Sequence, residues 1–301
     1  MRLRPMFPAL ALIPALLATG CPRAGAPPLT VDSRVRRMVP PQVIVRVADA
    51  STVSLEALVA DLRSVPITYA GERHDNEADH RMQNLLFRAL SDYDARTALG
   101  MEMFQRPFQS DLDLWSAGQL DEEALRRRTE WDARWGFDFA FYRPMLELAR
   151  ARNLPVIALN APRELTRAVG RGGVASLDAE TRAELPYLDL GDAAHRAMVE
   201  AALGDHGGMS SAQLEHLYEA QVLWDETMAE TVAEVMASPH APGHLLVLAG
   251  AFHVRAGLGI PRRAARRGAP EYRIVLVADD VAEANALAEE RPRPADYVWV
   301  P

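Results

Sequence analysis

The pattern Gly-x-x-His occurs twice in this chain, roughly 180 positions apart, and each copy directly follows a short apolar run. The copies span 71–74 and 250–253, and the apolar runs span 65–70 and 245–249. Apolar runs of this length are typical of buried strands in a parallel sheet. Both histidines would then lie just past the carboxyl ends of strands, where open α/β sheets place their ligand sites. The sequence therefore predicts that two imidazoles converge on one crevice.

Strand patterns alternate with helical patterns along most of the chain. The sequence predicts strands over residues 43–47, 65–70, 97–101, 156–160, 245–249 and 274–278. Apolar residues recur at helical spacing over 55–63, 77–90 and 139–152. This alternation predicts an α/β fold, with a mostly parallel sheet flanked by helices on both faces.

The stretch from 162 to 238 carries no convincing strand pattern. Its residues 211–236 form one long helical pattern that begins at an apparent cap, Ser210 or Ser211, with Glu215 close behind. We expect a helical insertion at about 162–238 that roofs the crevice.

The first residues have the pattern of a leader sequence. Arg2 and Arg4 precede an apolar stretch over 6–17 that is too short to span a bilayer, which indicates a signal peptide over 1–20. It ends in Leu17-Ala18-Thr19-Gly20-Cys21, which resembles a bacterial lipobox, so we expect lipidation at Cys21. Residues 21–41 are rich in Pro, Ala, Gly and Arg and are predicted to be a flexible tether, which leaves 42–301 for one α/β domain.

Composition excludes several kinds of chemistry. The formal net charge of −8 argues against a nucleic-acid partner. Every basic side chain is arginine, which excludes Schiff-base lysines and lysine-dependent phosphate loops. Cys21 is the only cysteine, so an internal disulfide and a thiolate metal cluster are also excluded. No serine lies in a Gly-x-Ser-x-Gly elbow, so any hydrolysis would require direct attack by water.

Polar residues gather at the predicted strand ends. These residues are Glu72, His74, Glu102, Asn160 and His253. Two imidazoles, two carboxylates and an amide would suit zinc, manganese or iron, and they would equally suit acid–base hydrolysis. Each residue alone fits a capping or hydrogen-bonding role, but that interpretation is weaker for the whole set.

Other titratable residues carry weaker signals. Asp225 and Glu226 follow apolar neighbours on the long helical pattern, so one carboxylate is expected to face inward towards an arginine, and Met228 is expected to fill core space. His80 is expected on a solvated helix face, with the crevice mouth as the alternative. The remaining histidines carry no motif and are predicted to be surface residues: His195, His206, His216, His240 and His244.

An ordered set of segments resembles the ChaN-like haem-binding uptake lipoproteins, members of the superfamily that includes the Tiki proteases and erythromycin esterases. The segments are GERHDN at 71–76, ALGMEMF at 98–104, WGF at 135–137, YRP at 142–144, ALNAPRE at 158–164, AQVLWDETMA at 220–229, GAFH at 250–253 and GLGIP at 257–261. The resemblance covers nearly the whole chain after the leader. It implies a parallel sheet flanked by helices, and a lipid-anchored protein of the outer membrane that binds haem in iron acquisition.

Haem needs an axial donor, an aromatic or apolar slot and cations for its propionates. On this resemblance the haem-binding candidates are Tyr142, Arg143, His74, His253 and Arg163. Arg134 is a further cation, and the candidate slot is formed by Trp131, Trp135, Phe137, Phe139 and Phe141, for which plain core packing is the alternative. The implied partners are haem, the membrane through the lipid, a second copy of the chain and an outer-membrane haem receptor.

The same resemblance leaves an enzyme as the alternative. Likeness to the Tiki proteases and esterases implies a hydrolase that depends on a divalent metal such as Mn, Zn or Fe, held by His74, Glu102 and His253. Glu72 or His74 would act as the general base, while the metal or His253 polarises the scissile carbonyl. Arg73 would steady the oxyanion. A third possibility is a domain that only presents a surface to a partner.

Overall fold

The computed structural model describes residues 42–203 and 209–301. The predicted leader, Cys21 and the whole predicted tether lie outside the described residues, and so does His206. None of the described helices is both long and apolar enough to cross a membrane.

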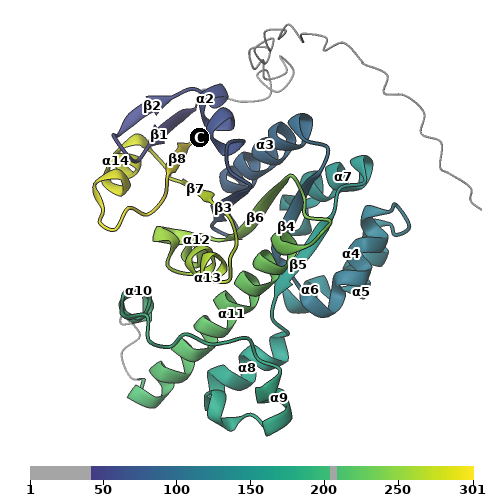
Figure 1. Ribbon diagram of the computed structural model, residues 1–301, viewed down its shortest axis with the longest axis vertical. Helices are drawn as coiled ribbons and strands as arrows, with labels where there is room; N and C mark the ends of the chain where they lie inside the picture. The colour runs from purple at the N-terminus through teal and green to yellow at the C-terminus, as the bar shows by residue number, and fades with distance from the viewer. Residues whose placement is uncertain (1–41, 204–208) are drawn as a thin grey trace, which may run out of the picture.

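One eight-stranded sheet runs through the molecule, in the order β2-β1-β8-β7-β3-β6-β4-β5 (Figure 1). The strands are β1 (Val43–Arg46), β2 (Ser51–Val53), β3 (Ile67–Glu72), β4 (Thr97–Gln105), β5 (Val156–Asn160), β6 (His244–Gly250), β7 (Tyr272–Val277) and β8 (Tyr297–Val300). The strand β1 pairs antiparallel with both β2 and β8, and the pairs from β8 to β5 are all parallel. The predicted α/β fold with a mostly parallel sheet is confirmed.

All six predicted strands exist, with ends that differ by a few residues. The largest difference is at β4, which continues to Gln105 and so carries its polar residues inside the sheet. The strands β2 and β8 were not predicted, because three or four residues are too few to show an alternating pattern.

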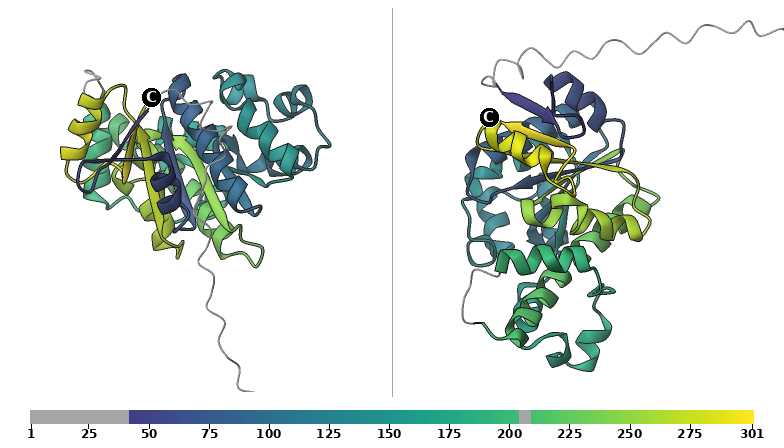
Figure 2. Two further views of the ribbon diagram at one scale, coloured as in Figure 1. Left: turned by 90° about the horizontal axis from the view of Figure 1, so that it is seen from above. Right: turned by 90° about the vertical axis from the view of Figure 1, so that its left-hand side faces the viewer.

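Helices cover both faces of the sheet (Figure 2). They are α2 (Leu55–Leu62), α3 (Glu77–Tyr93), α4 (Gln109–Ser116), α5 (Glu122–Arg128), α6 (Trp131–Arg134), α7 (Arg143–Arg152), α8 (Arg163–Gly172), α9 (Ala179–Ala183), α10 (Ala193–Leu203), α11 (Ser211–Ala237), α12 (Ala251–Val254), α13 (Ile260–Arg266) and α14 (Val281–Glu289). Short 3₁₀ turns lie at Arg106–Phe108, Phe139–Phe141, Val174–Ser176 and Arg255–Gly257.

Two hydrophobic cores result from the alternation of side chains along the strands. Leu246 and Leu248 of β6 pack into a core with α3 and α7, whereas Leu245 and Val247 pack into another core with α11 and α13. Successive side chains of a strand point to opposite faces, so these cores lie on the two sides of the sheet. Met228 is buried in the α11 core, as predicted.

The helical pattern predicted over 139–152 begins later than expected. A 3₁₀ turn occupies Phe139–Phe141, and α7 begins at Arg143 because Pro144 fits the first turn of a helix. The long helix α11 is capped by Ser210, whose hydroxyl accepts from the backbone N–H of Gln213 in a capping box. Gln213, rather than Glu215, completes that box.

The described residues between β5 and β6 form helices and no strand. The helices α8, α9 and α10 extend beyond the sheet beside α11 (Figure 1). Among the described helices of this stretch, α8 and α11 contribute residues to the crevice at the carboxyl ends of the strands. They bound the crevice on one side, whereas we had expected the whole insertion to roof it.

The outer edge of β5 is occupied by a side chain. The Gln109 carboxamide accepts from the backbone N–H of Ala158 at 2.8 Å and donates to the carbonyl of Val156 at 2.9 Å. Two of the backbone groups with which another strand could pair at this edge are therefore already hydrogen-bonded.

Candidate functional site

The two Gly-x-x-His motifs lie side by side because β3 and β6 pair in parallel, with Glu72 opposite Gly250. Each glycine leaves room for atoms of the other motif. A Cβ atom on Gly71 would lie 3.0 Å from the backbone Cα of Ala251, and one on Gly250 would lie 2.9 Å from Cε1 of His74. The close packing of the two strand ends therefore explains why glycine starts both motifs.

His74 is the accessible histidine of the pair, with 30 % of its side chain exposed. Its Nδ1 lies 2.9 Å from Oε1 of Glu72, and the rings of Trp135 and Phe137 lie 4.7 and 5.0 Å away. Burial opposes the charged ring, but Glu72 and Glu102 outweigh it and raise the pKa of His74. Nε2 has no hydrogen-bond partner among the described residues, so it is the nitrogen left for a ligand.

Glu72 is buried and orients His74. Besides His74, its Oε1 accepts from the Tyr142 hydroxyl at 2.5 Å, and its Oε2 accepts from Nε2 of Gln83 at 2.8 Å. Burial, together with the charge of Glu72, raises the pKa of Tyr142. His80 belongs to the same network, since its Nε2 lies 3.1 Å from the His74 carbonyl oxygen. The prediction that His80 occupies a solvated face is wrong because these groups bury it.

His253 differs from His74 because both of its ring nitrogens face carboxylates. Nδ1 lies 2.6 Å from Asp225, and Nε2 lies 3.4 Å from Oε1 of Glu102. Burial lowers the pKa of His253, but the charges of Glu102 and Asp225 exceed that effect and raise it well above its usual value. His253 is therefore a fixed imidazolium at the base of the site.

Asp225 is held between two histidines. Its second oxygen lies 2.9 Å from Nε2 of His195, whose Nδ1 accepts from the Arg263 guanidinium at 3.2 Å. Arginine can only donate, so the proton of His195 is on Nε2, facing Asp225. Despite burial, these contacts lower the pKa of Asp225. The prediction that His195 lies at the surface is wrong, because it is fully buried here.

The inward-facing carboxylate predicted to meet an arginine is Glu226. It contacts Arg263 at 3.1 Å, Arg266 at 2.6 Å and Arg267 at 2.5 Å. His244 is also buried, against the Thr68 hydroxyl at 3.0 Å, so its predicted surface position is wrong as well. A single histidine in a polar stretch of sequence shows no periodicity from which burial can be recognised.

Glu102 connects the two motifs from β4. Its Oε2 accepts from the backbone N–H of Gly250 at 2.6 Å. Burial would raise the pKa of Glu102, but the nearby charges of His253 and His74 lower it, so the side chain is a carboxylate. Asn160, at the end of β5, donates to the Glu102 carbonyl at 2.9 Å. The pairing of β4 with β5 shifts register between Met101 and Gln105, and such irregularities re-aim side chains beside ligand sites.

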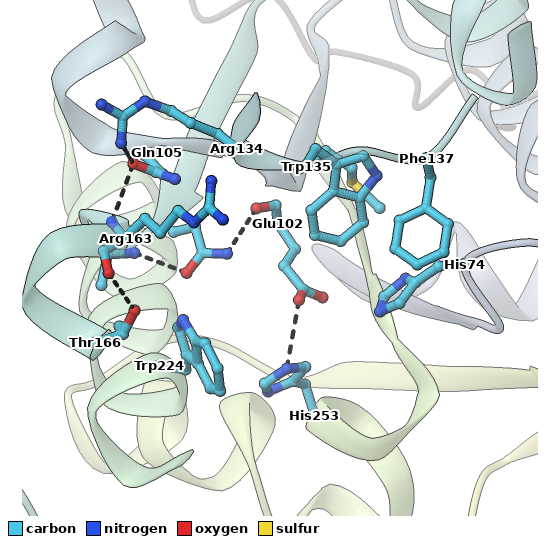
Figure 3. A pocket seen from close by; sticks show the side chains of 13 residues that line it. His74, Glu102, Gln105, Arg134, Trp135, Phe137, Arg163, Thr166, Trp224 and His253 are labelled. Atoms are coloured by element: carbon cyan, nitrogen blue, oxygen red, sulfur yellow. Dashed lines mark hydrogen bonds and ion pairs between the residues drawn. The ribbon is translucent and has the colours of Figure 1, made fainter. Parts of the chain in front are cut away.

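These residues surround a pocket of about 310 Å³, within the size range of small-molecule sites. Its walls combine aromatic rings, two arginines, and the His74, Glu102 and His253 group (Figure 3). The lining residues are His74, Glu102, Met103, Gln105, Arg134, Trp135, Phe137, Asn160, Ala161, Arg163, Thr166, Trp224 and His253.

Some of the candidates lie away from this pocket. Tyr142 is buried behind Glu72, and Arg143 pairs with Glu122 at 2.6 Å. Arg73 binds Asp79 and Asp279 instead of facing the pocket. Of the predicted aromatic slot, Trp135 and Phe137 line the pocket, whereas the other rings pack elsewhere: Trp131 and Phe139 are core residues, and Phe141 stacks on His80.

Trp224 and Gln221 were not predicted as site residues. Gln221 lies 3.1 Å from Nδ1 of His253, and Trp224 lines the pocket. Both lie on α11 at helical spacing from Asp225 and Met228, so they share one face of that helix. That spacing was the signal available in the sequence.

A divalent metal such as zinc would need several nitrogen or oxygen donors placed around one point. The part of the chain that the structure describes has no group of three or more His, Cys, Asp or Glu side chains placed to hold a metal ion. Both nitrogens of His253 already face carboxylates, which leaves His74 as the available imidazole donor.

The parallel sheet and the pocket at its carboxyl edge define an α/β protein with a ligand site between paired strand ends. The chain belongs to the family described as haem-binding uptake, Tiki superfamily, ChaN, whose model matches residues 58–264. Membership of this family supports a haem-binding role.

One solved structure shows the same fold at low sequence identity, and further proteins are similar to parts of the chain. A structure described as cofacial haem binding to ChaN of Campylobacter jejuni matches with a TM-score of 0.68 and 17% identity, over 86% of this chain and 96% of that chain. An erythromycin esterase matches with a TM-score of 0.46 and 12% identity, over 79% of this chain and 76% of that chain. Protein RETICULATA-RELATED 5, chloroplastic, of Arabidopsis thaliana is 25% identical over 79% of this chain, which spans 34% of that protein.

Proposed function

We propose that this protein binds haem in the pocket at the carboxyl edge of the sheet, with Nε2 of His74 as the iron ligand. The observation that carries the proposal is the orientation of the His74 ring. A buried carboxylate, Glu72, holds Nδ1 at 2.9 Å and leaves Nε2 for the ligand. A carboxylate behind a ligating histidine fixes its tautomer and increases its basicity.

The pocket walls suit a porphyrin. Trp135, Phe137 and Trp224 offer aromatic faces and edges for the macrocycle. Arg134 and Arg163 supply positive charge for propionates at the same pocket. The family supports the same ligand.

The structure favours His74 over the other candidate donors. The Tyr142 hydroxyl donates to Glu72 and is fully buried, so binding iron through this residue would require breaking a 2.5 Å hydrogen bond. His253 would have to lose its proton and one of its two carboxylate partners. We therefore assign Tyr142 to the support of Glu72, and His253 to fixing charge at the base of the pocket.

The cellular role is part of the proposal. We propose that Cys21 carries a lipid, that the lipid anchors the domain at the outer membrane, and that the bound haem is passed on in iron uptake. The lipobox-like segment and the family support this. An outer-membrane haem receptor and a second copy of the chain are the proposed protein partners.

A haem titration of the purified protein, followed at the Soret band, tests the proposal. We expect saturable binding that His74→Ala weakens about 100-fold, because the bond to iron is lost. Tyr142→Phe should weaken binding only several-fold, since Glu72 keeps its contact with His74. His240→Ala is the matched control, because His240 is exposed and remote from the pocket lining. Equal affinity in the wild-type and His74→Ala proteins would show that His74 is not the ligand.

A second candidate function is hydrolysis dependent on a divalent metal. It is favoured by the chain of contacts from Asp225 through His253 to Glu102, which lies in the same pocket as the unpaired Nε2 of His74. In this reaction His74 would accept a proton from water as the water oxygen bonds to a carbonyl carbon. His74 would then give that proton to the leaving group as the bond between the carbonyl carbon and the leaving group breaks.

Ester and peptide hydrolysis measured with added Mn, Zn or Fe, and again after chelation, tests this alternative. Turnover that is lost in His74→Ala and on chelation would favour the hydrolase. A Soret shift without turnover would favour the haem-binding protein.

A further inference from the structure

The pocket is electrically divided. At the ends of β3, β4 and β6, the buried carboxylates of Glu72 and Glu102 lie near His253, and Asp225 lies directly behind that imidazolium. When His74 is neutral, as iron binding through its Nε2 requires, three carboxylates against the one imidazolium of His253 leave this end negative. The opposite end carries the two arginines that reach the pocket from α6 and α8, and Figure 3 shows them at a distance from His74.

A single buried glutamine positions both arginines. Oε1 of Gln105 accepts from Nη1 of Arg134 at 2.9 Å and from the backbone N–H of Arg163 at 3.1 Å. Arg134 also pairs with two exposed carboxylates, Glu130 and Glu164, each at 2.9 Å. Its charge is therefore already balanced within the protein.

Arg163 is the arginine whose charge remains available. Its guanidinium donates to the backbone carbonyl of Ala133, and it forms no ion pair with a carboxylate in the described part of the chain. It is also the first residue of α8, a ten-residue helix whose N-cap, Pro162, makes no side-chain cap. The partial positive charge of a helix start adds to that of the guanidinium.

We infer that the pocket recognises the free carboxylates of a planar aromatic ligand through Arg163, and that it takes the iron-free porphyrin as well as haem. The inference rests on the proposed function and extends it to a class of ligand. The aromatic walls and the arginine contact the macrocycle and its carboxylates, and neither contact involves iron. The negative end of the pocket disfavours a carboxylate, so it sets the direction in which the ligand enters.

The test uses the full chain in detergent and three ligands: haem, iron-free protoporphyrin and the dimethyl ester of that porphyrin. Binding of the iron-free compounds is followed by their fluorescence, and haem by its Soret band. We expect the free-acid porphyrin to bind, and the ester to bind about tenfold or more weakly because its neutral ends cannot pair with Arg163. Arg163→Gln should weaken binding of the free acid by a similar factor and leave the affinity for the ester unchanged.

Matched variants separate recognition from folding. Arg167→Gln, an exposed change on the same helix outside the pocket lining, should bind all three ligands as the wild type does. Arg134→Gln should have a smaller effect than Arg163→Gln, since Glu130 and Glu164 already balance its charge.

Each outcome decides the matter. Haem binding with an ester as tight as the free acid overturns the inference and leaves the proposed function standing, and so does haem binding without any binding of iron-free porphyrin. If neither haem nor porphyrin binds, the proposed function fails, and the inference fails with it.

Discussion

The two Gly-x-x-His motifs have the same sequence pattern and the same place at a strand end, yet their histidines have different surroundings. His74 has one carboxylate partner, is partly exposed and keeps Nε2 unpaired within the described residues. His253 is buried between two carboxylates, and its pKa is raised well above its usual value. On the proposed function, one histidine binds the ligand and the other holds a charge.

The difference originates outside the motifs. Glu72 lies inside the first motif, two residues before His74, whereas the partners of His253 come from β4 and α11. A motif therefore fixes where a histidine is placed, and the rest of the chain determines its protonation. Two histidines in the same sequence pattern can therefore have different roles.

The largest expected effect concerns the two carboxylates that hydrogen-bond the histidines, Asp225 for His253 and Glu72 for His74. Asp225→Asn leaves the His253 imidazolium and His195 without their shared carboxylate, which should lower the free energy of unfolding by about 3–5 kcal/mol. Glu72→Gln should cost less, about 1–2 kcal/mol, because His74 is partly exposed and can stay neutral. Urea unfolding of both variants measures this. Equal losses of unfolding free energy in the two variants would contradict this difference between the two carboxylates.

The glycines of the two motifs should also differ. Gly71→Ala places a methyl group against the Ala251 backbone and Leu276, and should cost about 1–3 kcal/mol in thermal or urea unfolding. In Gly250→Ala the new methyl group meets mainly the His74 ring. That ring can shift, so stability should change less and haem affinity more. A Gly250→Ala protein with unchanged haem affinity would contradict the assignment of His74.

The smallest expected effect is the change of haem affinity with pH. A protonated His74 has no lone pair for iron, and its pKa is raised above the usual 6.5. Affinity should therefore be full above the raised pKa and fall as the pH drops through it, by about tenfold per pH unit. In His74→Ala this dependence should disappear. If the variant keeps the same pH profile, another group controls binding.

Much of the sheet was predictable because buried parallel strands leave long apolar runs, as in 245–249. The meeting of the two motifs was predictable because glycine and histidine followed such runs. The partners of His253 were not, because the helical pattern over 211–236 does not show which strand its residue Asp225 would meet. The sequence likewise did not show that Arg143 would pair with Glu122, which is distant in sequence, and lie away from the pocket.

The Gln109 side chain has a consequence for how this sheet meets other chains. An unprotected edge strand is a template on which further strands, including those of misfolded copies, add to build fibres. Gln109 occupies the N–H of Ala158 and the carbonyl of Val156, so the β5 edge resists such growth. This protection lies on the strand that ends at Asn160, a residue that lines the pocket.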